Sequence, residues 1–201
     1  IQEYRAAHQL TWVRGVQSRY NNKVLLVMDG VPIRDAYYSN FNIDEMIPIE
    51  IIDRIEVCNG PGSVLYGANS FSGVVNITTK KAGKSISAEA GTFNELRGNA
   101  QYDYKGIFAN VNYYNTDGFS PALNVDGLAR THNQVATNKS AFLSYNYKNL
   151  NVVGSYTDYK YPYKYRDSKS ENNYHKTPIY GMANYKFELG QEKNSSLNIR
   201  A

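Results

Sequence analysis

From residue 85 onward, apolar or aromatic side chains alternate with small or polar ones. A period of two places alternate side chains on opposite faces of an extended strand. About seven segments follow this pattern, most of them close to the roughly 9–11 residues that a tilted strand needs to cross a bilayer. The pattern therefore predicts antiparallel β-structure across this region. One segment alternates Ile107, Ala109, Val111 and Tyr113 with Phe108, Asn110, Asn112 and Tyr114.

The connections between these segments alternate in length. Residues 105–106 and 148–149 are tight turns and 190–195 is short, whereas 117–139 and 160–177 are long and polar. In an up-and-down meander, every second connection lies at the same end of the sheet. One end therefore has tight turns and the other has long loops, which is typical of outer-membrane barrels. On this pattern alone, a soluble antiparallel sandwich stays open as the alternative.

Composition excludes several classes of protein. The mean hydropathy is −0.55, and the chain has no apolar run near the roughly 18 residues of a membrane helix. Barrel strands are compatible with this value, because their alternation averages out as hydrophilic. The net charge of +4 is weak and scattered, so no nucleic-acid partner is expected. Cys58 is the only cysteine, which excludes an internal disulfide.

Residues 1–81 have the texture of a compact α/β domain. Residues 24–28 are a continuous apolar run, as in a strand buried on both faces, and Asp29-Gly30 ends it. Residues 51–57 and 74–78 predict two further strands. Between them, Gly60 and Gly62 permit backbone conformations that other residues resist.

Several motifs in this region have a fixed order. Residues 51–80 contain Arg-Ile-Glu-Val, then Gly-Pro-Gly-Ser-Val-Leu-Tyr-Gly, then Gly-Val-Val-Asn-Ile-Thr-Thr-Lys. Upstream are Trp-Val-Arg-Gly at 12–15, Val-Leu-Leu-Val-Met-Asp-Gly-Val-Pro at 24–32 and Ile-Pro-Ile-Glu at 47–50. Together they resemble the plug domain of TonB-dependent receptors in content and spacing.

The resemblance implies an α+β plug domain with a small mixed sheet over residues 1–81. An antiparallel transmembrane β-barrel segment would follow over residues 82–201, incomplete at about seven strands. The segment that contacts TonB would precede Ile1. The protein would lie in the bacterial outer membrane, surrounded by lipid. It would import a scarce extracellular ligand: a siderophore, haem, cobalamin, metal chelate or oligosaccharide.

The resemblance also implies ligand contacts. In this family the apical plug loops follow the Arg-Gly strand and the Asp-Gly turn, which correspond here to residues 17–22 and 34–41. An ordinary solvated loop is an equally good account of any single residue there. The expected ligand contacts are Gln17, Ser18, Arg19, Tyr20, Asp35, Tyr37, Tyr38 and Asn40.

Neither a catalytic set nor a metal site is expected, and no cofactor is implied. His8, His132 and His175 are far apart, and none has metal-ligand spacing with Cys58. Two alternatives stay open. One is a soluble extracellular β-rich module that binds carbohydrate through loop tyrosines. The other is an enzyme with a nucleotide site at Gly60-x-Gly62, although about ten residues before the next strand are too few for a crossover helix.

Arg14 gives the sharpest prediction. The resemblance implies that it pairs with a barrel glutamate, and a buried charge without its partner is costly. The second arginine position of this contact is occupied by Asn59. We expect Arg14→Ala to loosen the plug from the barrel in the full-length protein. Thermal unfolding and transport assays test this; if neither changes, the assignment of Arg14 is wrong.

Overall fold

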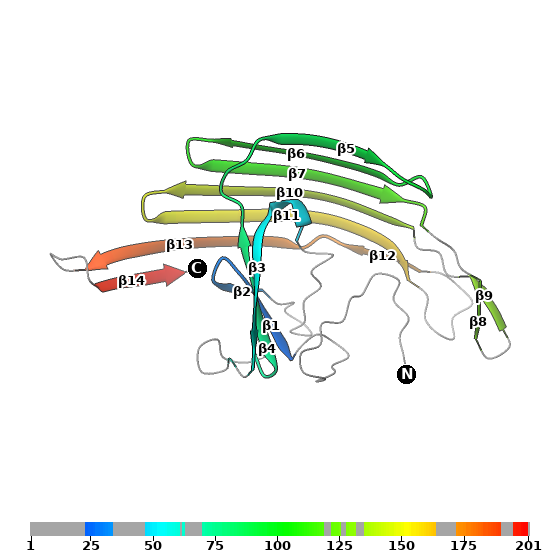
Figure 1. The fold of residues 1–201 in the computed structure, drawn as a ribbon, viewed down its shortest axis with the longest axis horizontal. Helices are drawn as coiled ribbons and strands as arrows, with labels where there is room; N and C mark the ends of the chain where they lie inside the picture. The colour runs from blue at the N-terminus through cyan, green and yellow to red at the C-terminus, as the bar shows by residue number, and fades with distance from the viewer. Residues whose placement is uncertain are drawn as a thin grey trace. The chain divides into compact units, whose positions relative to one another are not determined.

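The computed structural model describes residues 23–33, 47–60, 62, 70–118, 122–125, 128–131, 135–163, 172–189 and 195–200. A short 3-10 helix, η1 (Ile49–Ile51), is the one helical element among them. The strands form a four-stranded, an eight-stranded and a two-stranded sheet (Figure 1). The chain divides into two compact units. One comprises Gln9–Lys81, Asn146–Val152 and Met182–Ala201, and the other Ile1–His8, Ala82–Tyr145 and Val153–Gly181.

The four-stranded sheet has the order β2-β1-β4-β3. Its strands are β1 (Val24–Met28), β2 (Val31–Ile33), β3 (Ile52–Asn59) and β4 (Gly73–Thr79). β1 and β4 are parallel, whereas the β1–β2 and β3–β4 pairs are antiparallel. The predicted small mixed sheet is therefore confirmed: the ends of β1, β3 and β4 lie within two residues of their expected places, whereas β2 was not predicted as a strand.

β1 forms the centre of this sheet. All five of its residues are buried, as the continuous apolar run predicts. Leu25 and Val27 pack with Val74 of β4 in one cluster. Each fully buried Val, Leu or Met side chain contributes about 1.5–3 kcal/mol relative to an exposed one. The short run of apolar residues is therefore a principal source of stability for this sheet.

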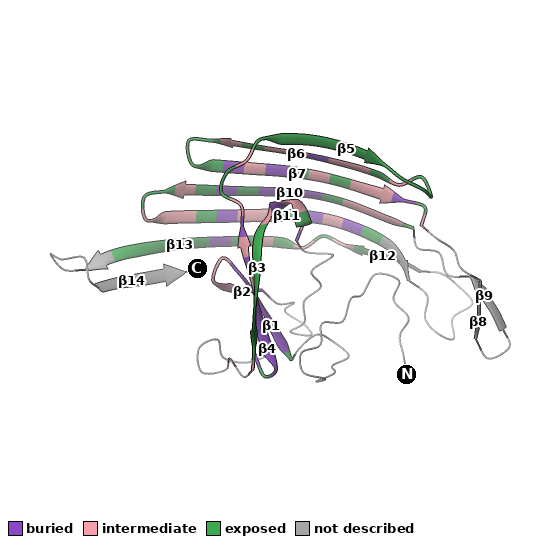
Figure 2. Ribbon diagram, viewed as in Figure 1, coloured by how far each residue is buried: buried purple, intermediate pink, exposed green. Residues whose placement is uncertain are grey.

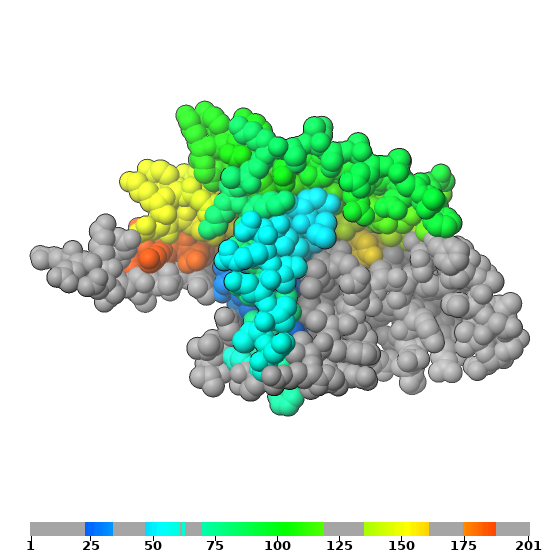
Figure 3. All heavy atoms as spheres, viewed as in Figure 1, coloured from blue at the N-terminus to red at the C-terminus, as the bar shows by residue number. Residues whose placement is uncertain are grey.

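β3 lies at the edge of the same sheet. Its apolar residues Ile55 and Val57 are more than half exposed, at 52% and 55%. The free thiol of Cys58 is exposed as well. In Figure 3 this strand, in cyan, lies at the surface of the face shown. Alternation in the sequence predicted the strand but carried no information on which neighbour would cover it.

The eight-stranded sheet contains the predicted alternating segments. Its order is β14-β13-β11-β10-β7-β6-β5, with β12 paired to β11. The pairs β5–β6, β6–β7, β7–β10, β11–β12 and β13–β14 are antiparallel. Its strands are β5 (Ser85–Ala90), β6 (Leu96–Tyr104), β7 (Ile107–Thr116), β10 (Ala136–Tyr147), β11 (Leu150–Tyr163), β12 (Asn172–Lys176), β13 (Ile179–Leu189) and β14 (Ser195–Arg200).

Two of the expected loops contain additional strands. β8 (Ala122–Val125) and β9 (Leu128–Thr131) form a two-stranded hairpin within residues 117–139. β12 lies within residues 160–177, and β11 extends to Tyr163. β8, β9 and β12 are only four or five residues long, too short for a two-residue period to separate them from loop. The long connections are thus shorter than predicted.

The tight turns lie where the sequence placed them. Lys105 and Gly106 connect β6 to β7 with φ of 46° and 82°, and Lys148 has φ of 50° after β10. Positive φ at both central residues is the mark of a two-residue hairpin turn whose twist matches that of the strands. Gly106 adopts this conformation without steric cost.

Asp29 joins the ends of β1 and β4. Its Oδ1 accepts a hydrogen bond of 2.9 Å from the Thr79 N–H, and its Oδ2 accepts one of 2.6 Å from the Thr79 hydroxyl. The Asp29 N–H in turn donates to the Ile77 carbonyl at 2.9 Å. The carboxylate therefore continues the parallel β1–β4 ladder beyond the last residue of β1.

We expect Asp29→Asn to lower the free energy of unfolding by about 1–3 kcal/mol, because an amide cannot accept both bonds with the strength of a carboxylate. Asparagine tolerates the positive φ of 48° at this position, so the backbone is preserved. Asp53→Asn is the matched control, since that side chain is exposed and lies 3.9 Å from Arg54. Equal unfolding midpoints for the two variants would contradict the role given to Asp29.

Candidate functional site

The buried face of β6, β7 and β10 is largely polar. The register places Asn99, Asn112 and Ser140 in one row across the three strands. Asn110 is only 1% exposed. Figure 2 shows buried positions, in purple, alternating with exposed ones along β7 and β10. The buried residues of this face are Asn99, Phe108, Asn110, Ser140, Phe142 and Ser144.

The opposite face of the same strands is apolar and exposed. One row across it consists of Ala100, Val111 and Ala141. Val111 is 55% exposed. We call this surface the outward face. Its large exposed residues are Ile86, Tyr102, Tyr104, Ile107, Val111, Tyr113, Leu143 and Tyr145.

This burial is inverted relative to a soluble sheet. Sheets in water bury their apolar face and solvate the polar one. Strands of a membrane barrel carry apolar side chains toward lipid and polar ones toward the interior. A contiguous exposed apolar surface in a monomer marks an interaction site with a membrane or another protein. The alternation recognised in the sequence therefore has the polarity of a barrel wall.

Polar atoms on the buried face reinforce this interpretation. Both amide atoms of Asn110, Oδ1 of Asn112, and the hydroxyls of Ser140 and Ser144 make no hydrogen bond to the residues that the structure describes. Buried polar atoms are almost always paired in a dry core. The polar atoms on this face therefore suit a polar interior better than an apolar core.

Two aromatic residues also lie on this face. The rings of Phe108 and Phe142 contact each other edge to face, with centroids 6.1 Å apart.

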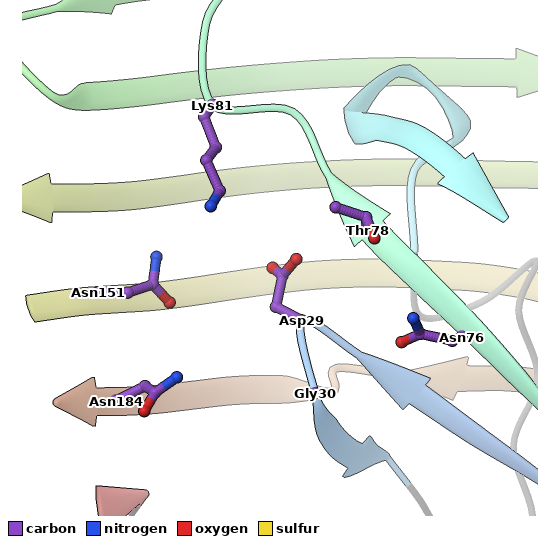
Figure 4. A pocket seen from close by; sticks show the side chains of 7 residues that line it. All are labelled: Asp29, Gly30, Asn76, Thr78, Lys81, Asn151 and Asn184. Carbon is purple, nitrogen blue, oxygen red and sulfur yellow. The ribbon is translucent and has the colours of Figure 1, made fainter. Parts of the chain in front are cut away.

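A separate polar pocket lies at the end of β1 and β4, within the compact unit that contains Gln9–Lys81. Its volume is about 270 Å³. Figure 4 shows Asp29 and Gly30, which follow β1, and residues of β4 on one side, with Asn151 of β11 and Asn184 of β13 on the other. The lining residues are Asp29, Gly30, Asn76, Thr78, Lys81, Asn151 and Asn184.

Six of the seven residues that line this pocket carry hydrogen-bonding side chains. The Asp29 carboxylate is engaged by Thr79. Asn76 Nδ2 donates to Glu56 Oε2 at 2.8 Å, while Oδ1 of Asn76 and of Asn184 find no partner among the described residues. The Lys81 ammonium adds one cation. Such a lining accommodates polar solutes, and among the described residues no cluster of three His, Cys, Asp or Glu could hold a metal ion.

The sequence identified only part of this pocket. The Asp29-Gly30 turn was visible as a motif, but Asn151 and Asn184 lie far away in the chain and converge only in the folded unit. His175 contacts Asp158 at 2.7 Å on the surface, a pair that sequence spacing did not suggest.

The expected ligand contacts and Arg14 lie outside the described residues, so their placement stays a prediction. This concerns Gln17, Ser18, Arg19, Tyr20, Asp35, Tyr37, Tyr38, Asn40 and Arg14.

The glycine-rich turn is not the start of a crossover. Gly60 N–H donates to Ser72 O at 3.2 Å and Gly62 N–H to Ser70 O at 2.9 Å, which extends the antiparallel β3–β4 pairing. A dinucleotide site needs parallel strands joined by a helix. Gly60 has φ of +124°, a conformation that favours glycine.

In the described ranges, no helix has the length and apolarity needed to cross a membrane.

Comparison with known proteins identifies the four-stranded sheet. Residues 2–74 match the family described as TonB-dependent Receptor Plug Domain. The chain is also 31% identical over 151 residues to the vitamin B12 transporter BtuB of Vibrio vulnificus (strain CMCP6). That alignment covers 73% of this chain and 22% of the transporter. The chain therefore spans about a fifth of the length of this relative.

Solved structures show the same fold. The ferric yersiniabactin uptake receptor FyuA from Yersinia pestis matches with a TM-score of 0.62 and 16% identity, over 91% of this chain and 33% of that one. The pyoverdine outer membrane receptor FpvA from Pseudomonas aeruginosa PAO1 matches with a TM-score of 0.56 and 18% identity, over 89% and 29%. Both likenesses combine the plug sheet with antiparallel strands.

Motifs, mixed sheet, inverted burial and relatives agree: the chain belongs to the TonB-dependent receptors of the bacterial outer membrane, with a plug domain and antiparallel strands that resemble their barrel wall.

Proposed function

We propose that this protein imports a scarce extracellular ligand of the siderophore or cobalamin class across the outer membrane, driven by TonB. Residues 1–81 form the plug and residues 82–201 contribute strands to the wall. The protein binds and gates, without catalysing a reaction. Its partners are TonB, a small ligand and outer-membrane lipid.

The observation that carries this proposal is the inverted burial of β6, β7 and β10. In a soluble carbohydrate-binding module, Val111, Leu143 and Ile107 would stay in water. Each would then lose the favourable free energy of burying an apolar side chain. Lipid removes that penalty, and a polar lumen accommodates Asn110 and Ser144 on the other side. The names of the relatives, which specify vitamin B12, ferric yersiniabactin and pyoverdine, support this ligand class.

The polar pocket beside Asp29 supports a plug that can move. Polar groups exchange hydrogen bonds with water at a small net free energy, about 0.5–1.5 kcal/mol each. Because Lys81, Asn151 and Asn184 line this pocket with polar groups, water can replace the groups of β4 there at a smaller cost than at an apolar interface. The buried β1–β4 pair, in contrast, keeps the plug sheet itself intact. On this proposal, pulling through TonB displaces the sheet as one body at the pocket.

Two neighbouring substitutions test the membrane assignment. Val111→Lys places a charge on the outward face and is expected to cost about 2–4 kcal/mol near the bilayer centre, whereas Asn112→Lys faces the polar interior and should cost much less. Yield of folded receptor in outer-membrane fractions measures both. In a soluble sandwich, Asn112→Lys would instead lower the yield more than Val111→Lys, because position 111 is exposed and position 112 is partly covered.

Growth of a deletion strain tests transport. The strain should fail on one limiting source, either a ferric siderophore or cobalamin, and a plasmid carrying the full-length gene should restore growth. Loss of TonB should abolish the same growth despite complementation. Haem and oligosaccharide sources complete the panel, and a defect confined to one of them would correct the ligand class. Unchanged growth on every source would contradict the proposed import.

A further inference from the structure

Lysine and tyrosine side chains pair at the tight-turn end of the outward face. Lys84 Nζ lies 4.9 Å from the centroid of the Tyr102 ring, and Lys105 Nζ lies 5.1 Å from that of Tyr104. Both rings are more than half exposed, at 56% and 54%. Ammonium groups within about 6 Å of an aromatic centroid are attracted by the ring quadrupole. The two cations are therefore held at the aromatic edge of an apolar surface.

The position of each pair follows from the register. Tyr104 lies opposite Ile107, and Tyr102 lies opposite Ala109. On the outward face, tyrosines therefore lie beside Ala109 and Ile107 near the tight turn, and Val111 lies further from it. Aromatic and cationic side chains at the end of an exposed apolar surface match the region of a bilayer where hydrocarbon meets headgroups.

The carboxylate of Asp103, which lies between Tyr102 and Tyr104 in the sequence, does not neutralise these lysines. Asp103 alternates onto the opposite face, where its Oδ1 accepts a hydrogen bond of 2.9 Å from the Gly83 N–H. Lys105 lies on a turn with positive φ, which projects it from the end of the hairpin. The cations therefore extend from this end without a carboxylate from β6 on the same face.

A third lysine lies over a tyrosine ring at another tight turn, whereas the arginine that contacts a ring lies elsewhere in the sheet. Lys148 Nζ lies 5.3 Å from the Tyr147 ring at the next tight turn along the chain. Arg97 also contacts a ring, that of Tyr114 at 5.1 Å, but it is on the inner face and pairs with Glu95. Arg97 is accordingly neutralised within the protein.

We propose that Lys84 and Lys105, held over Tyr102 and Tyr104, bind the phosphate of an anionic phospholipid headgroup in the leaflet at the tight-turn end. The inference rests on the proposed membrane function. A headgroup phosphate supplies the charge complement of the ammonium groups held over these two tyrosines, which are two residues apart on one face of β6. Its acyl chains cover the adjacent Ile107 and Val111, which are exposed. A free phosphate ion would satisfy the lysines and leave this apolar surface uncovered.

Thermal unfolding of the full-length receptor in neutral detergent tests the proposal. Phosphatidylglycerol added to the micelles should raise Tm, because a ligand that binds the folded state stabilises it. Phosphatidylcholine should raise it less, and inorganic phosphate at the same concentration should have no effect. In Lys84→Gln with Lys105→Gln, the lipid concentration for the same shift should rise roughly fivefold for each lysine.

Two further variants separate charge from structure. Lys84→Arg with Lys105→Arg keeps both cations and should retain the response. Lys139→Gln removes an exposed lysine of the same sheet near the other end of β10, opposite Tyr113, and should respond as the unmodified receptor does. A normal response in the double glutamine variant, an equal loss with Lys139→Gln, or an equal shift with inorganic phosphate would each overturn the lipid site.

The membrane function is tested independently of this site. If Val111→Lys is excluded from the outer membrane while the double glutamine variant responds normally to phosphatidylglycerol, the receptor function stands and the lipid site fails. If Val111→Lys is tolerated and the protein does not fractionate with the outer membrane, the proposed function fails and the lipid site with it.

Discussion

The antiparallel register of β6, β7 and β10 is the constraint on which the rest of the structure depends. Each residue lies opposite residues of the neighbouring strands whose side chains point to the same face, so side chains of one kind form rows across the strands. A slip of one residue would move Val111 inward and Asn110 outward and would exchange the two faces. The tight turn at Lys105-Gly106 prevents such a slip, because a two-residue loop with positive φ fixes the register of its hairpin.

The plug sheet has the opposite construction. Its central strand, β1, is buried along its whole length, and its partner β4 is buried at most positions. Parallel pairing of these two strands brings residues about 50 positions apart into one ladder, and the Asp29 carboxylate closes it at Thr79. The two sheets are built for different surroundings. The plug sheet keeps its shape through its buried apolar strands, whereas the inner face of the wall presents polar groups that are compatible with water.

Charge is distributed according to the same geometry. Polar and amide groups gather on the inner face and in the pocket beside Asp29. Lysines gather over tyrosines at the tight-turn end of the outward face. The Lys105-Gly106 turn therefore has two effects: it sets the register of its hairpin, and it places a cation where an apolar surface gives way to polar surroundings.

The sequence by itself determined the longer strands, the tight turns and the family, but not the short strands β2, β8, β9 and β12. A two-residue period and Asp-Gly or Lys-Gly turns are local properties, since sterics and backbone dihedrals act over a few residues. It also determined that Gly60-x-Gly62 could not begin a crossover helix, because too few residues precede β4. Only the tertiary structure decided which of the two faces is buried, which strand is at the sheet edge, and that Asn151 and Asn184 meet Asp29. Alternation divides side chains between faces without saying what will cover either one, and residues distant in the chain converge only through packing.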